Sequence, residues 1–185
     1  MAKIGFIGMG NMGYAILKGL LNVYGKEEII FTDVNPGRCR QVSEETGVSF
    51  AACNAECAAS AKYIVLAVKP QFFAPVLSDI AGTVTKDHII ISIAPGITVD
   101  SVRETLGADK RIVRAMPNTP ALLGEGMTGV CYDPALFAKE EQETIRSLFE
   151  SFGKMQTVEE RLMNAVVCVS GSSPAYVYML SLIHI

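Results

Sequence analysis

The stretch KIGFIGMGNMG, residues 3–13, decides the fold. Residues 3–7 form an apolar run of strand length, and Gly8, Gly10 and Gly13 follow it in the spacing G-x-G-x-x-G. Apolar residues then recur at intervals of three and four, which is typical of an amphipathic helix. A glycine motif between a strand and a helix binds the pyrophosphate of a dinucleotide. Gly8 would permit the tight turn, Gly10 the approach of the pyrophosphate, and Gly13 the close packing of helix on strand.

Strand-like and helical segments alternate along the chain up to about residue 105. The expected strands cover residues 3–7, 28–32, 48–51, 63–68, 88–93, 111–115, 127–132 and 154–158, and the expected helices include 36–47, 71–80 and 139–152. This alternation predicts an α/β fold of the Rossmann type, with a doubly wound and mostly parallel sheet. From Glu159 onward only helical segments are expected. We therefore predict a dinucleotide-binding domain over residues 1–158 and the start of an all-helical domain over residues 159–185.

Three polar residues lie where the second expected strand ends. Asp33 comes twenty residues after Gly13, where an acid accepts hydrogen bonds from the ribose hydroxyls of NAD and repels a 2′-phosphate. Arg38 could neutralise that phosphate, and Asn35 could donate a hydrogen bond to it. A solvated helix charge is an equally good interpretation of Arg38. These residues by themselves do not choose between NADH and NADPH.

Composition and charge favour a protein that acts on small molecules. The chain has 185 residues, a net charge of −3 and no cluster of Lys and Arg, which argues against nucleic-acid binding. Its five scattered cysteines and two histidines predict no metal site, and they favour reduced thiols in a cytoplasmic protein. Residues 162–185 carry no charged side chain, but Ser170–Pro174 divides them into pieces too short to cross a bilayer. We therefore expect a small-molecule substrate and no membrane partner.

Five further segments occur in a fixed order along the chain, and the first two follow the fourth and fifth expected strands. They are Ala67–Pro70 (AVKP), Ser92–Thr98 (SIAPGIT), Arg114–Pro120 (RAMPNTP), Gly124–Gly126 (GEG) and Ser170–Tyr176 (SGSSPAY). In this order and spacing they resemble the pyrroline-5-carboxylate reductases over the chain up to about Leu180. The resemblance implies NAD(P)H-dependent reduction of the C=N bond of 1-pyrroline-5-carboxylate to L-proline, with NADPH preferred and NADH as the alternative. It also implies that the helical domain forms a homodimer or a larger homo-oligomer.

The resemblance implies roles for individual residues as well. The pyrophosphate would be held by Ile7, Gly8, Met9, Gly10, Asn11 and Met12. The nicotinamide end would be lined by Ala67, Val68, Lys69, Pro70 and Ala94. Asn54 would lie near the adenosine ribose, and the substrate side would be formed by Met116, Pro117, Asn118 and Ser172. A surface lysine is the alternative for Lys69, and a rigid turn is the alternative for residues 116–120.

The chain departs from the family at two places. Many relatives have glycine where Ser173 opens the last helix, and serine is a good N-cap there. Ser181–Ile185 does not resemble the family, and the last helix is expected to be cut short. In the family, later helices carry the residues that bind the substrate carboxylate and a catalytic threonine, so no catalytic residue is named within this chain. We expect the chain to bind cofactor and to be inactive or nearly so alone.

Other functions are compatible with the same motifs. A protonated imine demands no strong acid from the protein, so His88 is expected only to begin a buried strand. Another imine reductase or a 3-hydroxy-acid reductase would share this architecture. A non-catalytic dinucleotide-binding module is an alternative of a different class, and a structural domain without a ligand is the last. Regulation by proline is not visible in the sequence.

Overall fold

The apolar runs expected as strands form one eight-stranded sheet in the computed structural model, which describes residues 2–183. The strands are β1 (Ala2–Ile7), β2 (Ile29–Thr32), β3 (Ser49–Phe50), β4 (Ala61–Leu66), β5 (Ile89–Ser92), β6 (Arg111–Met116), β7 (Gly126–Cys131) and β8 (Gly153–Thr157). They lie in the order β3-β2-β1-β4-β5-β6-β7-β8. All neighbouring strands are parallel except β6 and β7, which are antiparallel. This order confirms the Rossmann-type, mostly parallel sheet.

Strand β4 begins and ends two residues before the expected range of 63–68. Its last residue, Leu66, pairs with Ile7, the last residue of β1. The chain turns sharply after Ile7 because Gly8 adopts a φ of 97°. Val68 therefore has no neighbouring strand to pair with, and it lies in the loop beyond the sheet instead.

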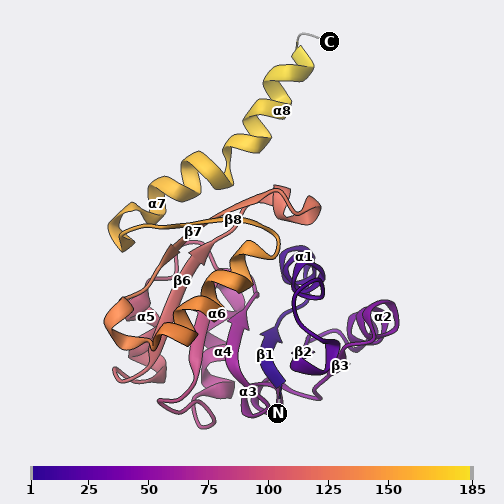
Figure 1. Cartoon of the computed structure of the whole chain (residues 1–185), viewed down its shortest axis with the longest axis vertical. Helices are drawn as coiled ribbons and strands as arrows, with labels where there is room; N and C mark the ends of the chain where they lie inside the picture. Colours follow the sequence, from indigo (N-terminus) through magenta and orange to yellow (C-terminus); the bar gives the residue numbers. More distant parts are fainter. Residues whose placement is uncertain (1, 184–185) are drawn as a thin grey trace.

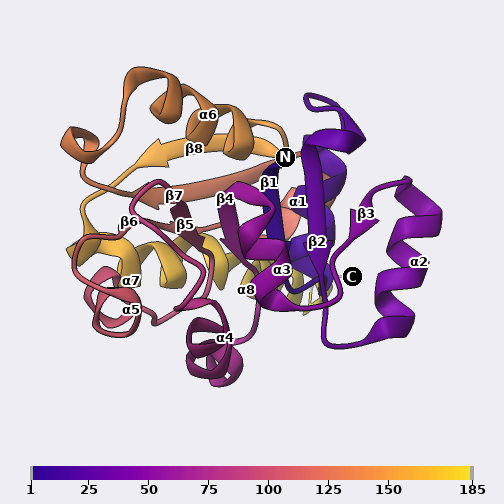
Figure 2. The same cartoon turned by 90° about the horizontal axis from the view of Figure 1, so that it is seen from below.

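Helices cover both faces of the sheet. They are α1 (Asn11–Leu20), α2 (Pro36–Thr46), α3 (Asn54–Ala59), α4 (Phe73–Ile80), α5 (Val99–Leu106) and α6 (Lys139–Glu150). Buried residues of α1, α2 and α6 join one core cluster, and those of α3, α4 and α5 join the other. Figure 2 shows α6 on the opposite side of the strands from α4 and α5. The unbroken apolar runs of β4 and β5 follow from this arrangement, because both faces of these strands are buried.

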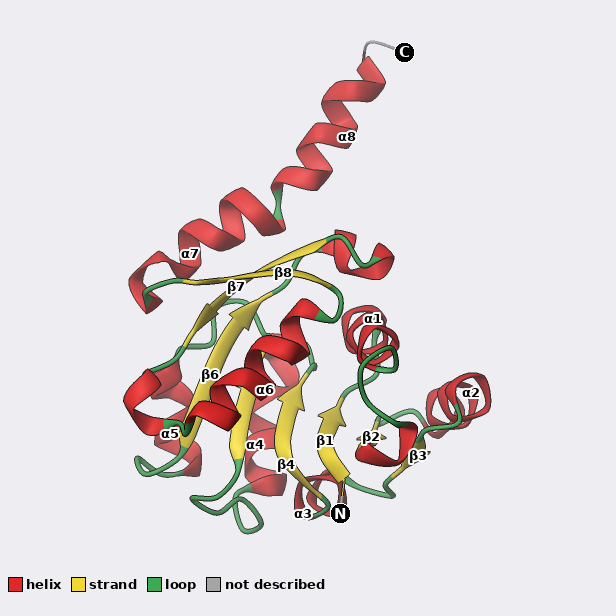
Figure 3. Cartoon of the chain, in the orientation of Figure 1, coloured by secondary structure: helices red, strands yellow, loops and turns green. Residues whose placement is uncertain are grey.

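The strand order reverses direction between β1 and β4. From β1 the chain proceeds outward to β2 and β3, and it then returns to continue from β4 on the other side of β1. The arrowheads of β1 and β4 point to the same edge of the sheet, where α1 also begins (Figure 3). In open α/β sheets, ligands bind at the carboxyl ends of the strands beside such a reversal. The fold thus places the glycine motif at the expected binding edge.

The last part of the described chain, residues 159–183, is called the arm below. It contains η5 (Glu160–Leu162), α7 (Met163–Val166), the π-helical turn η6 (Val167–Gly171) and α8 (Ser173–Ile183). Helix α7 lies against β7, and α8 projects away from the sheet (Figure 1). Helical structure after Glu159 was predicted correctly. No helix within residues 2–183 combines the length and the apolar character that a bilayer crossing requires.

The predicted capping role of Ser173 is not what the structure shows. Ser173 is the first residue of α8, so the capping position before the helix falls on Ser172. The hydroxyl of Ser172 donates to the carbonyl of Val167 at 3.2 Å, within the turn itself. Of the segment Ser181–Ile185, the residues His184 and Ile185 lie outside the described residues.

Candidate functional site: a crevice at the carboxyl ends of the strands

The turn after β1 depends on glycine at two positions. Gly8 has a φ of 97°, and a Cβ there would lie only 2.8 Å from the carbonyl oxygen of Ala67. A Cβ on Gly13 would lie 2.5 Å from the carbonyl oxygen of Gly8 and 3.2 Å from the Cβ of Ala67. Gly8 is therefore required for the turn, and Gly13 is required for the close contact between α1 and the loop after β4.

Gly10 differs from these two glycines because open space lies above it. A Cβ built on Gly10 meets no heavy atom within 4 Å. Helix α1 begins at the next residue, without a side-chain cap and without an acidic residue in its first turn. The first N–H groups of a helix have no partner inside the helix, and they attract anions. The turn thus presents uncapped N–H donors beside a surface that a phosphate can approach.

Asp33, at the end of β2, is connected to the glycine turn. Its Oδ2 accepts a hydrogen bond from the N–H of Met9 at 2.6 Å, and its Oδ1 accepts one from the N–H of Asn35 at 2.9 Å. Asn35 caps α2, because its Oδ1 accepts from the N–H groups of Gly37 and Arg38 at 2.9 and 3.3 Å. The carboxylate and the amide that the sequence places near the ribose therefore already order this edge of the crevice.

Arg38 lies against the glycine turn and is not a freely solvated helix charge. Its Nε donates to the carbonyl oxygen of Met9 at 2.9 Å. Its guanidinium carbon lies 4.8 Å from the centroid of the Tyr14 ring, on α1. Asp33 and Arg38 thus both bind the backbone of Met9. The N–H of Met9 donates to Asp33, and its carbonyl oxygen accepts from Arg38.

Two hollows lie on either side of the turn, and Val68 lines both. The β2-side hollow has a volume of about 260 Å³, and its lining residues are Ile7, Gly8, Asp33, Val34, Asn54, Val68, Phe72, Pro75, Val76 and Asp79. The β5-side hollow has a volume of about 400 Å³, and its lining residues are Gly10, Asn11, Met12, Ala67, Val68, Lys69, Pro70, Ile93, Pro95, Met116 and Pro117. The two hollows form a crevice over the carboxyl ends of β1, β2, β4, β5 and β6.

The structure brings most of the expected cofactor residues together at this crevice. Asn54 lies in the β2-side hollow, and its Nδ2 donates to Oδ2 of Asp79 at 2.9 Å. Ala94 is different, because its side chain is buried in the core cluster below the sheet, and its neighbours Ile93 and Pro95 line the hollow. His88 precedes β5 and accepts a hydrogen bond from the N–H of Thr85 at 2.9 Å through its Nδ1.

The expected substrate-side residues divide between the crevice and the arm. Met116 and Pro117 line the β5-side hollow. Asn118 faces the arm, where its Nδ2 donates to Oγ of Ser170 at 3.2 Å and its Oδ1 accepts from the N–H of Met127 at 2.9 Å. A third hollow of about 360 Å³ lies there, and its lining residues are Asn118, Val169, Ser170, Ser173, Pro174, Val177 and Tyr178. Ser172 does not line any of these three hollows.

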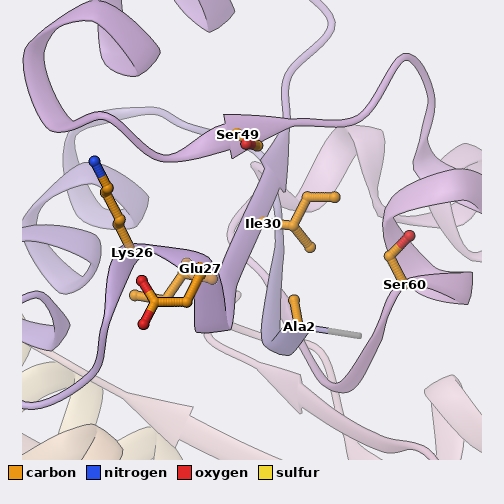
Figure 4. Close-up of a pocket in the computed structure, with 7 residues that line it drawn as sticks. Ala2, Lys26, Glu27, Ile30, Ser49 and Ser60 are labelled. Carbon is orange, nitrogen blue, oxygen red and sulfur yellow. The ribbon is translucent and has the colours of Figure 1, made fainter.

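Another hollow of about 420 Å³ lies at the opposite edge of the sheet (Figure 4). It is lined by Ala2, Ile29 and Ser49, the first residues of β1, β2 and β3. Figure 4 shows Lys26 and Ser60 on opposite sides of this hollow, so its polar groups do not converge. The crevice, where the backbone donors and the polar side chains meet, is therefore the candidate functional site.

Several crevice residues were not predicted from the sequence. Val34, Phe72, Pro75, Val76 and Asp79 line the β2-side hollow. The segment after β4 carries most of them, and its position beyond a carboxyl strand end was the available signal. Nothing in the local sequence distinguishes Asp79 from an ordinary exposed helix residue.

A protein-family model described as "NADP oxidoreductase coenzyme F420-dependent" matches residues 3–96. The pyrroline-5-carboxylate reductase of Escherichia coli (strain K12) is 42% identical over 180 residues, which cover 96% of this chain and 66% of that protein. The chain therefore spans about two thirds of the length of this relative.

Solved structures agree with the sequence comparison. A pyrroline-5-carboxylate reductase from Coxiella burnetii superimposes with a TM-score of 0.90 at 33% identity, over 97% of this chain and 67% of that one. The Plasmodium falciparum pyrroline carboxylate reductase, solved with NADP bound, gives a TM-score of 0.85 at 30% identity, over 97% of this chain and 66% of that one. With the sheet order, the glycine turn and the crevice in place, these relationships show that the chain belongs to the pyrroline-5-carboxylate reductase family.

Proposed function

We propose that the protein uses NADPH to reduce the C=N bond of 1-pyrroline-5-carboxylate, giving L-proline. The observation that carries this proposal is the crevice at the β1–β4 reversal, in a chain 42% identical to a pyrroline-5-carboxylate reductase. The open space above Gly10 and the uncapped start of α1 fit a pyrophosphate, since a side chain on Gly10 would fill that space. Residues Ile7–Met12 would hold it there.

The β2-side hollow would hold the adenosine half of the cofactor. Asp33 and Asn54 border it, and Arg38 lies beside the same turn. Both carboxylate oxygens of Asp33 already accept backbone N–H groups, which partly satisfies this acid and directs it toward the protein. Arg38 would supply the positive charge for a 2′-phosphate. This arrangement supports NADPH over NADH, in accord with the NADP bound in the Plasmodium falciparum relative.

The β5-side hollow would hold the nicotinamide half. Its lining is mostly apolar, with Val68, Ile93, Met116 and Pro117 around it and Lys69 at its border. When bound, the nicotinamide would supply a hydride for the C=N carbon of the protonated imine. The protein would exclude water from the apolar hollow and orient the two reactants, which needs no strong acid from the chain.

The substrate would enter between the β5-side hollow and the arm. Asn118 is held in place by bonds to Ser170 and Met127, so it joins the end of β6 to the π-helical turn.

We place the boundary between a dinucleotide-binding domain and a helical domain at residues 158 and 159. The helical domain would form a homodimer or larger homo-oligomer, and the catalytic residues would lie in the third of the relatives' length that this chain does not span. The cytoplasmic location stays a prediction.

A fluorescence titration of the purified chain with NADPH and with NADH tests the cofactor proposal. Saturable binding that favours NADPH is expected, and a preference for NADH would assign the ribose to Asp33 and contradict the proposal. The intact protein is then assayed with 1-pyrroline-5-carboxylate, and with a linear imine and a 3-hydroxy acid for comparison. Turnover of either of the last two in place of the cyclic imine would overturn the substrate assignment.

A further inference from the structure

A network of side chains joins α1 to α2 beside the glycine turn, and Arg38 is at its centre. Three contacts fix the guanidinium of Arg38. Its Nε donates to the carbonyl oxygen of Met9 at 2.9 Å, and its Nη1 donates to Oε1 of Gln41 at 3.1 Å. The third contact is with the face of the Tyr14 ring, 4.8 Å from the guanidinium carbon. Among residues 2–183, Nη2 of Arg38 has no hydrogen-bond partner.

A second layer of contacts holds the residues around Arg38. The hydroxyl of Tyr14 donates to Oε2 of Glu45 at 2.6 Å. The other carboxylate oxygen of Glu45 accepts from Nε2 of Gln41 at 2.9 Å. Glu45 therefore orients both residues that contact the guanidinium, one through a hydroxyl and one through an amide. The hydrogen bond from the Tyr14 hydroxyl to Glu45 raises the pKa of Tyr14 and lowers the pKa of Glu45. The network therefore favours the ionised carboxylate.

This arrangement matters because an arginine side chain has many rotamers. Ordering a long side chain at the moment of binding costs free energy, and ordering it beforehand removes that cost from the binding step. The network orders Arg38 without using all of its donors. It also holds Arg38 by the carbonyl of Met9, whose N–H is bonded to Asp33. The guanidinium is thus fixed relative to the acid that contacts the ribose in NAD-binding proteins.

We propose that Tyr14 and Glu45 are positioning residues that set the preference of this site for a ribose carrying a 2′-phosphate. They do so by holding the guanidinium of Arg38 beside the glycine turn, so that its free donor is available to the phosphate. The inference rests on the proposed function, since it requires that NADPH binds in the crevice. It adds residues of α1 and α2 that do not line either hollow of the crevice.

The test compares the dissociation constants for NADPH and NADH in variants of the two residues. Tyr14→Leu removes the ring and the hydroxyl, and we expect NADPH binding to weaken about fivefold, the size of one cation–π contact. Tyr14→Phe keeps the ring but loses the bond to Glu45, and about threefold weakening is expected. Glu45→Gln should resemble Tyr14→Phe. NADH binding should change by less than about twofold in all three variants, because NADH has no phosphate for Arg38 to contact.

Glu44→Gln is the matched control for Glu45→Gln, because it removes the same charge from an exposed position of α2. It should leave the NADPH-to-NADH ratio of dissociation constants unchanged. Thermal unfolding of each variant checks that the fold is kept. Equal weakening of both cofactors, or an unchanged ratio in Tyr14→Leu, would overturn the role of Tyr14 and Glu45. Failure of the unmodified chain to prefer NADPH would instead overturn the proposed function, and this inference with it.

Discussion

The sheet body, residues 2–158, and the arm, residues 159–183, differ in how far their apolar side chains are buried. In the body, large apolar side chains such as Phe6, Phe31 and Phe149 are fully buried between the sheet and its helices. In the arm, Met163 is the one buried apolar residue of the described side chains, while Val169 and Tyr178 are 70% and 64% exposed. The body therefore supplies its own core, whereas most of the arm's described apolar side chains lie at the surface. Changes in the body should therefore cost stability, whereas changes at the exposed apolar side chains of the arm should not.

Among the charged side chains, the largest effect is expected at Glu141, which links α6 to the sheet. Lys62 and Arg111 contact its two oxygens at 2.6 and 2.7 Å, and its side chain is only 10% exposed. Burial raises the pKa of this carboxyl, but the hydrogen bonds from both cations outweigh burial and lower the pKa to about 2. Glu141→Gln should lower the free energy of unfolding at pH 7 by about 3 kcal/mol. Urea unfolding measures the change.

The pH dependence of the free energy of unfolding provides a second test of the role of Glu141. Its pKa is lower in the folded protein than the ordinary value of 4.5, so its contribution is complete above that pH and is lost as the pH falls toward 2. The difference between wild type and Glu141→Gln should narrow to about half by pH 3. The control is Glu150→Gln, in an exposed pair with Arg146, which should cost less than about 0.5 kcal/mol. Similar losses for both variants would mean that burial of Glu141 is unimportant.

The next largest effect is expected in the glycine turn, where Gly13 and Gly10 have different roles. Gly13→Ala places a Cβ against the carbonyl of Gly8, so unfolding should become easier by about 2 kcal/mol. A Cβ on Gly10 meets no atom within 4 Å, so Gly10→Ala should cost only the weaker N-cap preference of alanine, less than about 1 kcal/mol. The methyl group would nevertheless occupy the proposed phosphate position and weaken NADPH binding about tenfold. Unchanged NADPH binding in Gly10→Ala would remove the pyrophosphate from this turn.

Local patterns were enough to predict the turn and most of the sheet. Gly8, Gly13 and Asp33 could be identified because a turn of the dinucleotide-binding type imposes a fixed spacing on one short segment. The end of β4 could not be found in this way, since it is set by Ile7 on a different strand. The two-residue strand β3 was only weakly indicated, and α3 was not predicted as a helix.

Contacts between distant segments account for the rest of the site. The sequence left Arg38 open between a solvated charge and a phosphate ligand, because its bonds to Met9 and its contact with Tyr14 cross from α2 to another element. Asp79 joins the crevice through Asn54, 25 residues earlier. The burial of Ala94 depends on how α4 and α5 pack below the sheet. No repeating pattern of residues within one segment predicts these contacts.

A smaller effect is expected at the junction of the body and the arm. Oε1 of Glu160 accepts from Nη1 of Arg114, on β6, at 3.1 Å and from the N–H of Val99, at the start of α5, at 2.8 Å. The Arg114 side chain is 5% exposed, so Glu160→Gln leaves a buried cation without a countercharge and should cost roughly 1.5 kcal/mol. Glu159→Gln is the control, because its pair with Arg161 is exposed. Equal unfolding free energies for the two variants would show that Glu160 does not fasten the arm.

The smallest effect is expected within the arm, at Tyr178. Its side chain is 64% exposed, so Tyr178→Ala should change the free energy of unfolding by less than about 0.5 kcal/mol. Phe149→Ala is the matched change in the body, where a fully buried ring is lost, and it should cost about 4 kcal/mol. A loss above about 1 kcal/mol for Tyr178→Ala would mean that another surface covers the arm. Repeating the measurement at several protein concentrations identifies that surface, because only contact with a second copy makes the Tyr178→Ala loss grow with concentration.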